Sequence, residues 1–250
     1  MENHIYALIG RSLKHSFSET YYNSYFSFHK MNDYVYKTIE IDKITELISI
    51  LKSNSHIEGF NVTIPYKEDI IPFLIKMSPT AKKIGAVNVV KVVRNGDQFE
   101  MHGYNTDYKG FEYMFKVLKN RSIANKNAII LGSGGVSKSV QYVLKKQEIP
   151  FLVVSREKKD HCLTYDQLTR EIIQSHKVII NCTPLGMYPN IQEKPQIVYD
   201  GIGSGHFLID LIYNPEQTQF MKEGMLRSAK VMNGMQMFLM QARESLKIFL

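Results

Sequence analysis

Short apolar stretches alternate with longer stretches of helical periodicity in the first part of the chain. Residues 5–9, 34–40 and 59–63 are either continuously apolar or alternate between apolar and polar, which is typical of strands. Between them, residues 19–31 and 44–51 repeat their apolar positions at the spacing of an amphipathic helix. The order strand, helix, strand, helix, strand predicts a parallel sheet.

The next segment predicts a helix, a hairpin and a second helix. Residues 66–76 follow Pro65, and their pattern favours a helix that starts at the proline. Residues 87–94 and 98–104 flank Asn95-Gly96, a dipeptide that is typical of a tight turn between antiparallel strands. The second helix is expected over about 108–118, with Asp107 as a plausible N-cap.

Strands and helices alternate again from Ala128 onward. Strands are expected at 128–131, 151–154, 178–181, 207–210 and 230–232. Helices are expected after Val136, at 165–174, from Pro215 and over 235–249. The predicted fold class is α/β, with two domains: an N-terminal α/β domain and a Rossmann-like domain.

The turn after the strand at 128–131 carries the most informative motif, Gly132-Ser133-Gly134-Gly135-Val136. Gly132 allows a sharp turn, Gly134 lets the backbone approach a phosphate, and the following helix N-terminus attracts an anion. Ser137 stands where the dinucleotide-binding pattern has its third small residue. The motif therefore predicts a pyrophosphate site, and a glycine-rich turn without a ligand is the alternative.

The end of the next predicted strand indicates which dinucleotide would bind. Proteins that bind NAD place a carboxylate there for the ribose 2′-hydroxyl, but here the strand continues into Ser155-Arg156-Glu157-Lys158-Lys159. Three cations within five residues suit a 2′-phosphate better, so we predict NADP as the cofactor. The alternative is an ordinary exposed, charged loop.

Charge and composition narrow the choice of partners. The 250 residues include 31 Lys and Arg against 24 Asp and Glu, which leaves a formal charge of +7. The basic residues are scattered and lack an RNA-binding aromatic signature, so no nucleic acid is expected. A small anionic substrate together with a phosphorylated cofactor accounts equally well for the charge.

Cysteine usage and the N-terminal sequence bear on location. Cys162 and Cys182 have neither metal-ligand spacing nor the density of a disulfide scaffold, so no metal is expected and the thiols are predicted to be reduced. The N-terminal residues lack a basic leader, and no apolar run approaches the ~18 residues of a membrane span. We expect a cytoplasmic protein without a membrane partner.

Polar residues at predicted element ends are candidates for a substrate site. Ser16 and Ser18 stand at a helix start, where they could hold a carboxylate or simply cap the helix. Lys67 follows a parallel strand and falls in the first turn of the predicted helix 66–76, where a cation is poorly placed against the helix dipole. The alternative for Lys67 is a surface lysine.

Eight ordered segments of the chain resemble the shikimate dehydrogenase family. These segments are Ile9-Gly10 with His15-Ser-Phe-Ser18, Asn61-Val-Thr-Ile-Pro-Tyr-Lys67, Gly85-Ala-Val-Asn88, Gly103-Tyr-Asn-Thr-Asp107 with Gly110-Phe111, Gly132-Ser-Gly-Gly135, Asn181-Cys-Thr-Pro-Leu-Gly-Met187, Asp210-Leu-Ile-Tyr-Asn-Pro215 and Asn233-Gly-Met235 with Gln241. The resemblance implies an enzyme that reversibly converts 3-dehydroshikimate and NADPH to shikimate and NADP.

The resemblance also implies roles for single residues. The residues expected to bind substrate are Ser16, Ser18, Thr63, Lys67, Asn88, Asp107, Tyr213 and Gln241. The residues expected to bind NADP are Gly132, Ser133, Gly134, Gly135, Val136, Ser155, Arg156, Lys159, Thr183, Met187, Ile212 and Gly234. Lys67 and Asp107 are the expected catalytic residues. Whether Lys67 alone or the pair acts as acid and base is left open.

The chain departs from the family pattern at Glu19, where a proline is usual, and at Val89, where a threonine is usual. The start of the cofactor helix, Val136-Ser-Lys-Ser, also lacks the usual alanines. We expect a substrate domain of residues 1–107 with 236–250, an NADP domain of residues 108–235, and a monomer or homodimer. The remaining alternatives are a quinate/shikimate dehydrogenase, an NAD-using relative and a non-catalytic metabolite-binding module.

Overall fold

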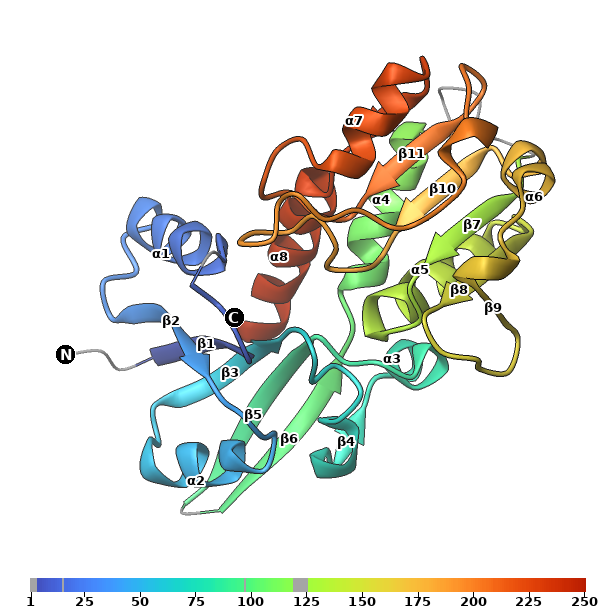
Figure 1. Ribbon diagram of the computed structural model, residues 1–250. Coiled ribbons are helices and arrows are strands. Elements are labelled where there is room, and N and C mark those ends of the chain that lie inside the picture. Colours follow the sequence, from blue (N-terminus) through green and yellow to red (C-terminus); the bar gives the residue numbers. More distant parts are fainter. Residues whose placement is uncertain (1–3, 15, 97, 119–125) are drawn as a thin grey trace. The chain divides into compact units, whose positions relative to one another are not determined.

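The computed structural model describes residues 4–14, 16–96, 98–118 and 126–250 of the protein (Figure 1). The chain forms two compact units. The first consists of Met1–Thr106 with Gln241–Leu250, and the second of Asp107–Met240. Each unit has its own sheet and its own hydrophobic core. The assignment of substrate binding to the first unit and cofactor binding to the second stays a prediction.

The first unit is a mixed sheet with the strand order β2-β1-β3-β5-β6-β4. Its elements are β1 (His4–Gly10), α1 (Ser18–Phe28), β2 (Tyr34–Glu40), α2 (Glu46–Ser53), β3 (Ile57–Val62), η1 (Ile71–Phe73), β4 (Lys76–Met77), α3 (Pro79–Ile84), β5 (Val89–Asn95) and β6 (Gln98–Tyr104). Strands β2, β1 and β3 are parallel, as the alternation of strand and helix predicts. Strands β5 and β6 form the predicted antiparallel hairpin.

Strand β1 is a run of apolar and aromatic residues from Ile5 to Ile9 because both of its faces are buried there. Ile5, Ala7 and Ile9 belong to a core that includes residues of α2. Tyr6 and Leu8 point to the opposite face, into a core that includes residues of α1 and of the C-terminal helix α8 (Met235–Phe249). Successive side chains of a strand point to opposite faces, so a strand buried on both sides needs an unbroken apolar run.

Side chains of α1 cover the open edge of β2. Asn23 accepts a hydrogen bond from the backbone N–H of Tyr36 (2.8 Å) and donates one to the carbonyl of the same residue (2.9 Å). One turn earlier, Glu19 accepts hydrogen bonds from the N–H and the hydroxyl of Thr38 (3.0 and 2.9 Å). These bonds occupy edge groups that could otherwise pair with another strand, and they hold α1 along β2.

The prediction of a helix at residues 66–76 is wrong. Residues 64–70 form turns, which lead into the short 3-10 helix η1 and then strand β4. The physical reason is Pro72, which lacks an N–H and disfavours helical backbone at the residue before it. Lys67 therefore stands in a turn, and the argument from a helix dipole does not apply to it.

The second unit is a fully parallel sheet with the strand order β12-β11-β10-β7-β8-β9. Its elements are α4 (Asp107–Leu118), β7 (Ala128–Leu131), α5 (Gly135–Lys146), β8 (Phe151–Ser155), β9 (Cys162–Thr164), η3 (Tyr165–Gln167), α6 (Arg170–Ser175), β10 (Val178–Asn181), η4 (Tyr199–Gly201), β11 (Phe207–Asp210), α7 (Gln219–Leu226) and β12 (Lys230–Met232). This is the doubly wound order of dinucleotide-binding sheets, which reverses between β7 and β10.

Helices cover both faces of the second sheet. One core joins residues of α4 and α5 to the strands, and the other joins residues of α6 and α7 to the opposite face. The predicted helix 165–174 is divided into η3 and α6, because Thr164 and Thr169 each cap a separate short helix. The helix expected to open at Pro215 begins at Gln219 instead, where Thr218 is its N-cap.

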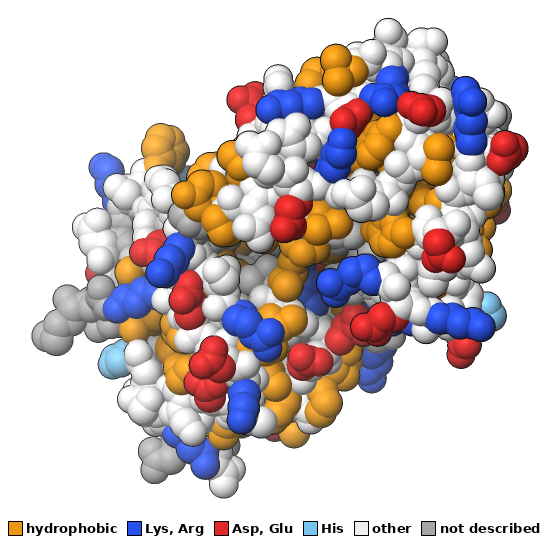
Figure 2. All heavy atoms as spheres, in the orientation of Figure 1, with side chains coloured by type: hydrophobic (Ala, Val, Ile, Leu, Met, Phe, Trp, Pro, Cys, Tyr) orange, Lys and Arg blue, Asp and Glu red, His pale blue; other side chains and the backbone are white. Residues whose placement is uncertain are grey.

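The surface carries charges of both signs. On the face drawn in Figure 2, Lys and Arg side chains are interspersed with Asp and Glu side chains, and apolar side chains lie between them. Among the helices that the structure describes, none is both long enough and apolar enough to cross a membrane.

Candidate functional site

The glycine turn lies at the carboxyl end of β7, next to the point where the strand order reverses. Gly132 has a φ of +102°, which favours glycine, and its N–H donates to the carbonyl of Val154 (2.8 Å). A Cβ on Gly132 would stand 3.1 Å from Cγ2 of Thr183. The turn therefore packs directly against the start of the loop after β10, and two of the predicted cofactor residues meet.

The backbone at the start of α5 suits an anionic group. Gly134 is the N-cap, and no side chain caps the helix there. A Cβ on Gly134 would meet no atom within 4 Å, so open space lies in front of this backbone. Ser137 is fully buried, as expected for the third small residue of the motif. A helix N-terminus with open space before it fits the pyrophosphate of a dinucleotide.

Hydroxyl and ammonium groups gather between the glycine turn and the end of β8. The Ser133 hydroxyl donates to Oγ of Ser155 (3.3 Å) and accepts a hydrogen bond from Nζ of Lys159 (3.1 Å). Ser155 is buried, whereas Arg156 and Lys159 are exposed. The structure thus brings Ser133, Ser155 and Lys159 together with Arg156 beside them, and these donors fit a phosphate group.

A buried carboxylate joins the ends of β10 and β11. Oδ1 of Asp210 accepts hydrogen bonds from the N–H of Ile212 and from Nδ2 of Asn181 (both 3.1 Å), and Oδ2 accepts one from the Thr218 hydroxyl (2.6 Å). Oδ1 of Asn181 in turn accepts from the hydroxyl (2.6 Å) and the N–H (3.0 Å) of Thr183. Burial raises the pKa of Asp210 to about 6. This network fixes the two loops that carry Thr183 and Ile212.

Ile212 and Gly234 approach each other closely. The N–H of Gly234 donates to the carbonyl of Ile212 (3.0 Å), and a Cβ on Gly234 would stand 2.0 Å from the carbonyl oxygen of Leu211. No side chain fits at that distance, so glycine is required there for packing. Tyr213, the next residue, packs its ring at a tilt against that of Phe238 of α8, with ring centroids 4.7 Å apart.

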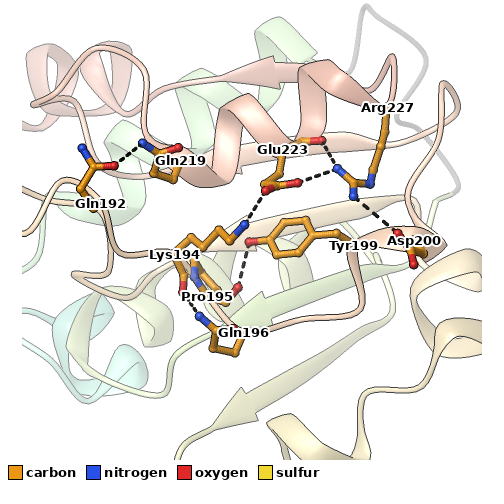
Figure 3. A network of polar contacts seen from close by, with 9 residues as sticks. All are labelled: Gln192, Lys194, Pro195, Gln196, Tyr199, Asp200, Gln219, Glu223 and Arg227. Atoms are coloured by element: carbon orange, nitrogen blue, oxygen red, sulfur yellow. Dashed lines mark hydrogen bonds and ion pairs between the residues drawn. The ribbon is translucent and has the colours of Figure 1, made fainter.

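Ion pairs hold the long connection between β10 and β11 against α7 (Figure 3). Glu223 of α7 binds Lys194 of the connection on one side and Arg227 (2.6 Å) on the other. Both cations lie over the ring of Tyr199, with Nζ of Lys194 5.0 Å from its centroid. The same connection carries Met187, an exposed residue that is predicted to bind the cofactor. The network thus anchors the base of the loop that presents Met187.

In the first unit, the predicted substrate residues lie at strand ends and at the start of α1. Oγ of Ser16 accepts a hydrogen bond from the N–H of Ser18 (3.2 Å). The helix begins at Ser18, and its N-cap is Phe17 rather than either serine. The N–H of Thr63 donates to the carbonyl of Ile9 (2.9 Å), which joins the ends of β3 and β1.

Lys67 is half-buried, and its backbone is tied to the segment that precedes β5. The N–H of Val87 donates to the carbonyl of Lys67 (2.8 Å). This bond places Lys67 next to the segment that contains Asn88.

Asn88 and Gln241 meet although 153 residues separate them. Nδ2 of Asn88 donates to Oε1 of Gln241 (3.3 Å) and to the hydroxyl of Thr106 (2.9 Å). Oδ1 of Asn88 accepts a hydrogen bond from the N–H of Thr106 (2.6 Å). Thr106 was not among the predicted site residues, although it lies in one of the segments that resemble the family, 103–107.

Two expected groupings join residues of different units and stay predictions. One is the pair of Lys67 and Asp107, and the other is Tyr213 with Ser16 and Ser18. Asp107 is buried in the first turn of α4 rather than standing before it as an N-cap. Within the described ranges, no group of three or more His, Cys, Asp or Glu side chains could hold a metal ion.

A doubly wound parallel sheet with an open glycine turn at its reversal point defines a dinucleotide-binding α/β protein. The family model of the shikimate dehydrogenase substrate binding domain matches residues 8–90. The shikimate dehydrogenase (NADP(+)) of Clostridium beijerinckii is 38% identical over 258 residues, which are 98% of this chain and 91% of that protein.

Solved structures are similar over the same extent. Shikimate dehydrogenase 1 of Peptoclostridium difficile has a TM-score of 0.85 at 36% identity, and the match covers 98% of this chain and 91% of that one. A shikimate dehydrogenase in complex with NADP+ has a TM-score of 0.81 at 31% identity, with 99% and 90% covered. The chain belongs to the shikimate dehydrogenase family.

Proposed function

We propose that this protein is an NADP-dependent shikimate dehydrogenase. It reversibly reduces 3-dehydroshikimate to shikimate with NADPH, a step of aromatic amino acid biosynthesis. The observation that carries the proposal is the similarity to enzymes of this name along 98% of the chain. The cofactor geometry of the second unit supports it independently.

NADP is proposed to lie across the carboxyl ends of β7, β8, β10 and β11. The residues proposed to hold it are Gly132, Ser133, Gly134, Gly135, Val136, Ser155, Arg156, Lys159, Thr183, Met187, Ile212 and Gly234. The open backbone at Gly134 suits the pyrophosphate, and Arg156 with Lys159 suits the 2′-phosphate. When bound, the nicotinamide supplies or accepts the hydride.

The substrate is proposed to bind through its carboxylate and its ring hydroxyls. The hydroxyls of Ser16 and Ser18, together with Tyr213, hold the carboxylate. The ring hydroxyls are held by Thr63, Lys67, Asn88, Asp107 and Gln241. In support, Ser16 lies beside the backbone N–H of Ser18 at the start of α1, and Asn88 contacts Gln241 directly.

Lys67 and Asp107 are proposed to handle the proton that accompanies hydride transfer. During reduction, the Lys67 ammonium donates a proton to the carbonyl oxygen as it becomes a hydroxyl. During oxidation, the neutral amine accepts that proton back. The Asp107 carboxylate is proposed to orient the lysine or to share its proton.

A reducing, cytoplasmic setting is proposed because both cysteines, Cys162 and Cys182, are free thiols in the structure. The protein is proposed to act as a monomer or homodimer. Sedimentation velocity of the purified protein at several concentrations measures which of the two exists.

The direct test is purified protein with shikimate and NADP, followed by the absorbance of the reduced nicotinamide. Parallel assays with quinate and with NAD separate the proposed activity from that of a quinate/shikimate dehydrogenase or an NAD-using relative. Reduction of NADP by shikimate at a kcat/KM well above that for the other pairs supports the proposal. Absence of turnover with shikimate and both cofactors, in protein that binds NADP, overturns it and favours a non-catalytic binding module.

A further inference from the structure

A continuous chain of hydrogen bonds runs through the first unit and includes two of the proposed substrate residues, Asn88 and Gln241. Its members come from β2, β3, the segment before β5, the segment after β6, and α8; they are Tyr36, Asn61, Asn88, Thr106, Gln241 and Ser245. Ser245 is fully buried and has three partners: Nδ2 of Asn61 (3.2 Å), the hydroxyl of Thr106 (3.0 Å) and the backbone carbonyl of Gln241 (2.8 Å).

The chemistry of each group fixes the direction of these bonds. A carbonyl only accepts, so the proton of Ser245 goes to the carbonyl of Gln241. The bond between Ser245 and Thr106 must then be donated by Thr106, whose hydroxyl accepts in turn from Nδ2 of Asn88. Nδ2 of Asn61 is the second donor to Ser245. Ser245 therefore uses its one donor and both of its acceptor positions.

The side-chain amides are fixed by the same reasoning. A backbone N–H only donates, so the atom of the Asn88 amide that faces the N–H of Thr106 must be the oxygen, Oδ1. The nitrogen, Nδ2, therefore faces Gln241. Since Nδ2 of Asn88 donates to Gln241, the oxygen of the Gln241 amide faces Asn88 and its nitrogen faces away. Nε2 of Gln241 has no hydrogen-bond partner among the described residues. It is a donor held in one orientation, ready for an oxygen atom of a ligand.

We propose that Ser245 is a positioning residue that holds Gln241 with its amide nitrogen presented to a hydroxyl group of the substrate. The inference rests on the proposed function and adds a residue to it. Ser245 touches no substrate in this scheme. It acts by accepting the Thr106 hydroxyl proton and by binding the backbone of Gln241 one helical turn earlier, which fixes both ends of the Asn88–Gln241 contact.

Without the Ser245 hydroxyl, the Thr106 proton would turn to Oε1 of Gln241, which already lies 3.4 Å away. Oε1 would then have two competing donors, and Nδ2 of Asn61 would keep only one of its two acceptors, the carbonyl of Asn88. The Gln241 amide would no longer be held in one orientation. Because the contact that Gln241 makes is expected in the ground state as well as in the transition state, its loss raises KM more than it lowers kcat.

The test is steady-state kinetics of Ser245→Ala with shikimate and NADP, at saturating levels of the other substrate. The expected result is a rise of about tenfold in the KM for shikimate, as for a lost buried hydrogen bond, with kcat within about threefold and the KM for NADP unchanged. Thr106→Val, which removes the hydroxyl but keeps the shape, should show the same pattern. Thr106→Ser, which keeps the hydroxyl, should restore the KM.

A matched control separates positioning from loss of stability. Ser139→Ala removes another fully buried serine hydroxyl from a helix, in the second unit. It should leave the KM for shikimate unchanged even if it lowers the melting temperature. The double variant Ser245→Ala with Thr106→Val should raise the KM no further than either single change, since both break one chain.

Two results would overturn the inference. One is an unchanged KM for shikimate in Ser245→Ala; the other is an equal loss of kcat and of affinity for both substrates, which indicates general damage to the fold. Failure of the proposed function is distinct, because the wild-type protein would then show no turnover of shikimate.

Discussion

The buried carboxyl of Asp210 should make the stability of the protein depend on pH. It lies at the end of β11 with no exposed surface and accepts three hydrogen bonds. Burial raises its pKa from 3.8 to about 6, since the hydrogen bonds that favour the charged form offset only part of the desolvation cost. Asp210→Asn removes the charge and keeps both the shape and an acceptor for Ile212.

The sign follows from proton linkage. The folded state binds this proton more tightly than the unfolded chain does, so the carboxyl stabilises the fold below about pH 4 and loses that contribution as the pH rises through about 6. A difference of about 2 pKa units corresponds to about 3 kcal/mol. About 2 kcal/mol of this stabilisation is lost between about pH 4.5 and pH 7.5. Over that range, the unfolding free energy of the wild type minus that of Asp210→Asn should therefore decrease by about 2 kcal/mol.

Urea unfolding followed by circular dichroism is the suitable assay, because the chain contains no tryptophan. Added NADP identifies the transition of the unit that binds it, since a ligand of the folded state shifts that transition to higher urea. Asp166→Asn is the matched control: Asp166 is exposed, so the same substitution there removes a carboxylate without disturbing the buried network around Asp210. A difference for Asp210→Asn that is flat, or that grows with pH, would refute the reasoning.

Three further predictions concern the proposed site. Lys67→Ala should lower kcat by at least about 100-fold as acid–base catalysis is lost, whereas a raised KM with unchanged kcat would identify a binding residue. Arg156→Ala should weaken NADP by about tenfold or more in a binding titration and leave NAD unaffected, while Lys158→Ala next to it should do less; equal losses for both cofactors contradict the assignment. Gly234→Ala places a Cβ 2.0 Å from the carbonyl of Leu211, so both the melting temperature and NADP affinity should fall, and normal values of both would show that the loop can move apart.

The strands were predictable because their signal is local. Strand β2 occupies the predicted residues 34–40, and β7, β10, β11 and β12 also have their predicted limits. A strand that is buried on one or both faces must carry its apolar residues in a fixed local pattern, whatever it packs against. The glycine turn is equally local, because a positive φ at Gly132 requires glycine in the sequence itself.

The ends of the helices were less predictable, because several nearby residues could each start or end a helix. Pro72 breaks the expected helix 66–76, and Thr169 and Thr218 each offer an N-cap further along than the expected helix starts. The Thr218 hydroxyl also donates to Asp210, eight residues earlier. Apolar spacing alone does not rank such caps, since their advantage depends on the hydrogen bonds that the folded chain supplies.

The sequence by itself thus determined the fold class, the family and the candidate residues, because each leaves a pattern within a few neighbouring positions. The tertiary structure alone decided which of these side chains are held, and by what. Ser245 meets Asn61 and Thr106 across separations of 184 and 139 residues. Its four-residue spacing from Gln241 is ordinary for a helix, so nothing in the sequence distinguishes it. A hydrogen bond between distant residues is specified by the folding of the whole chain and has no local signature.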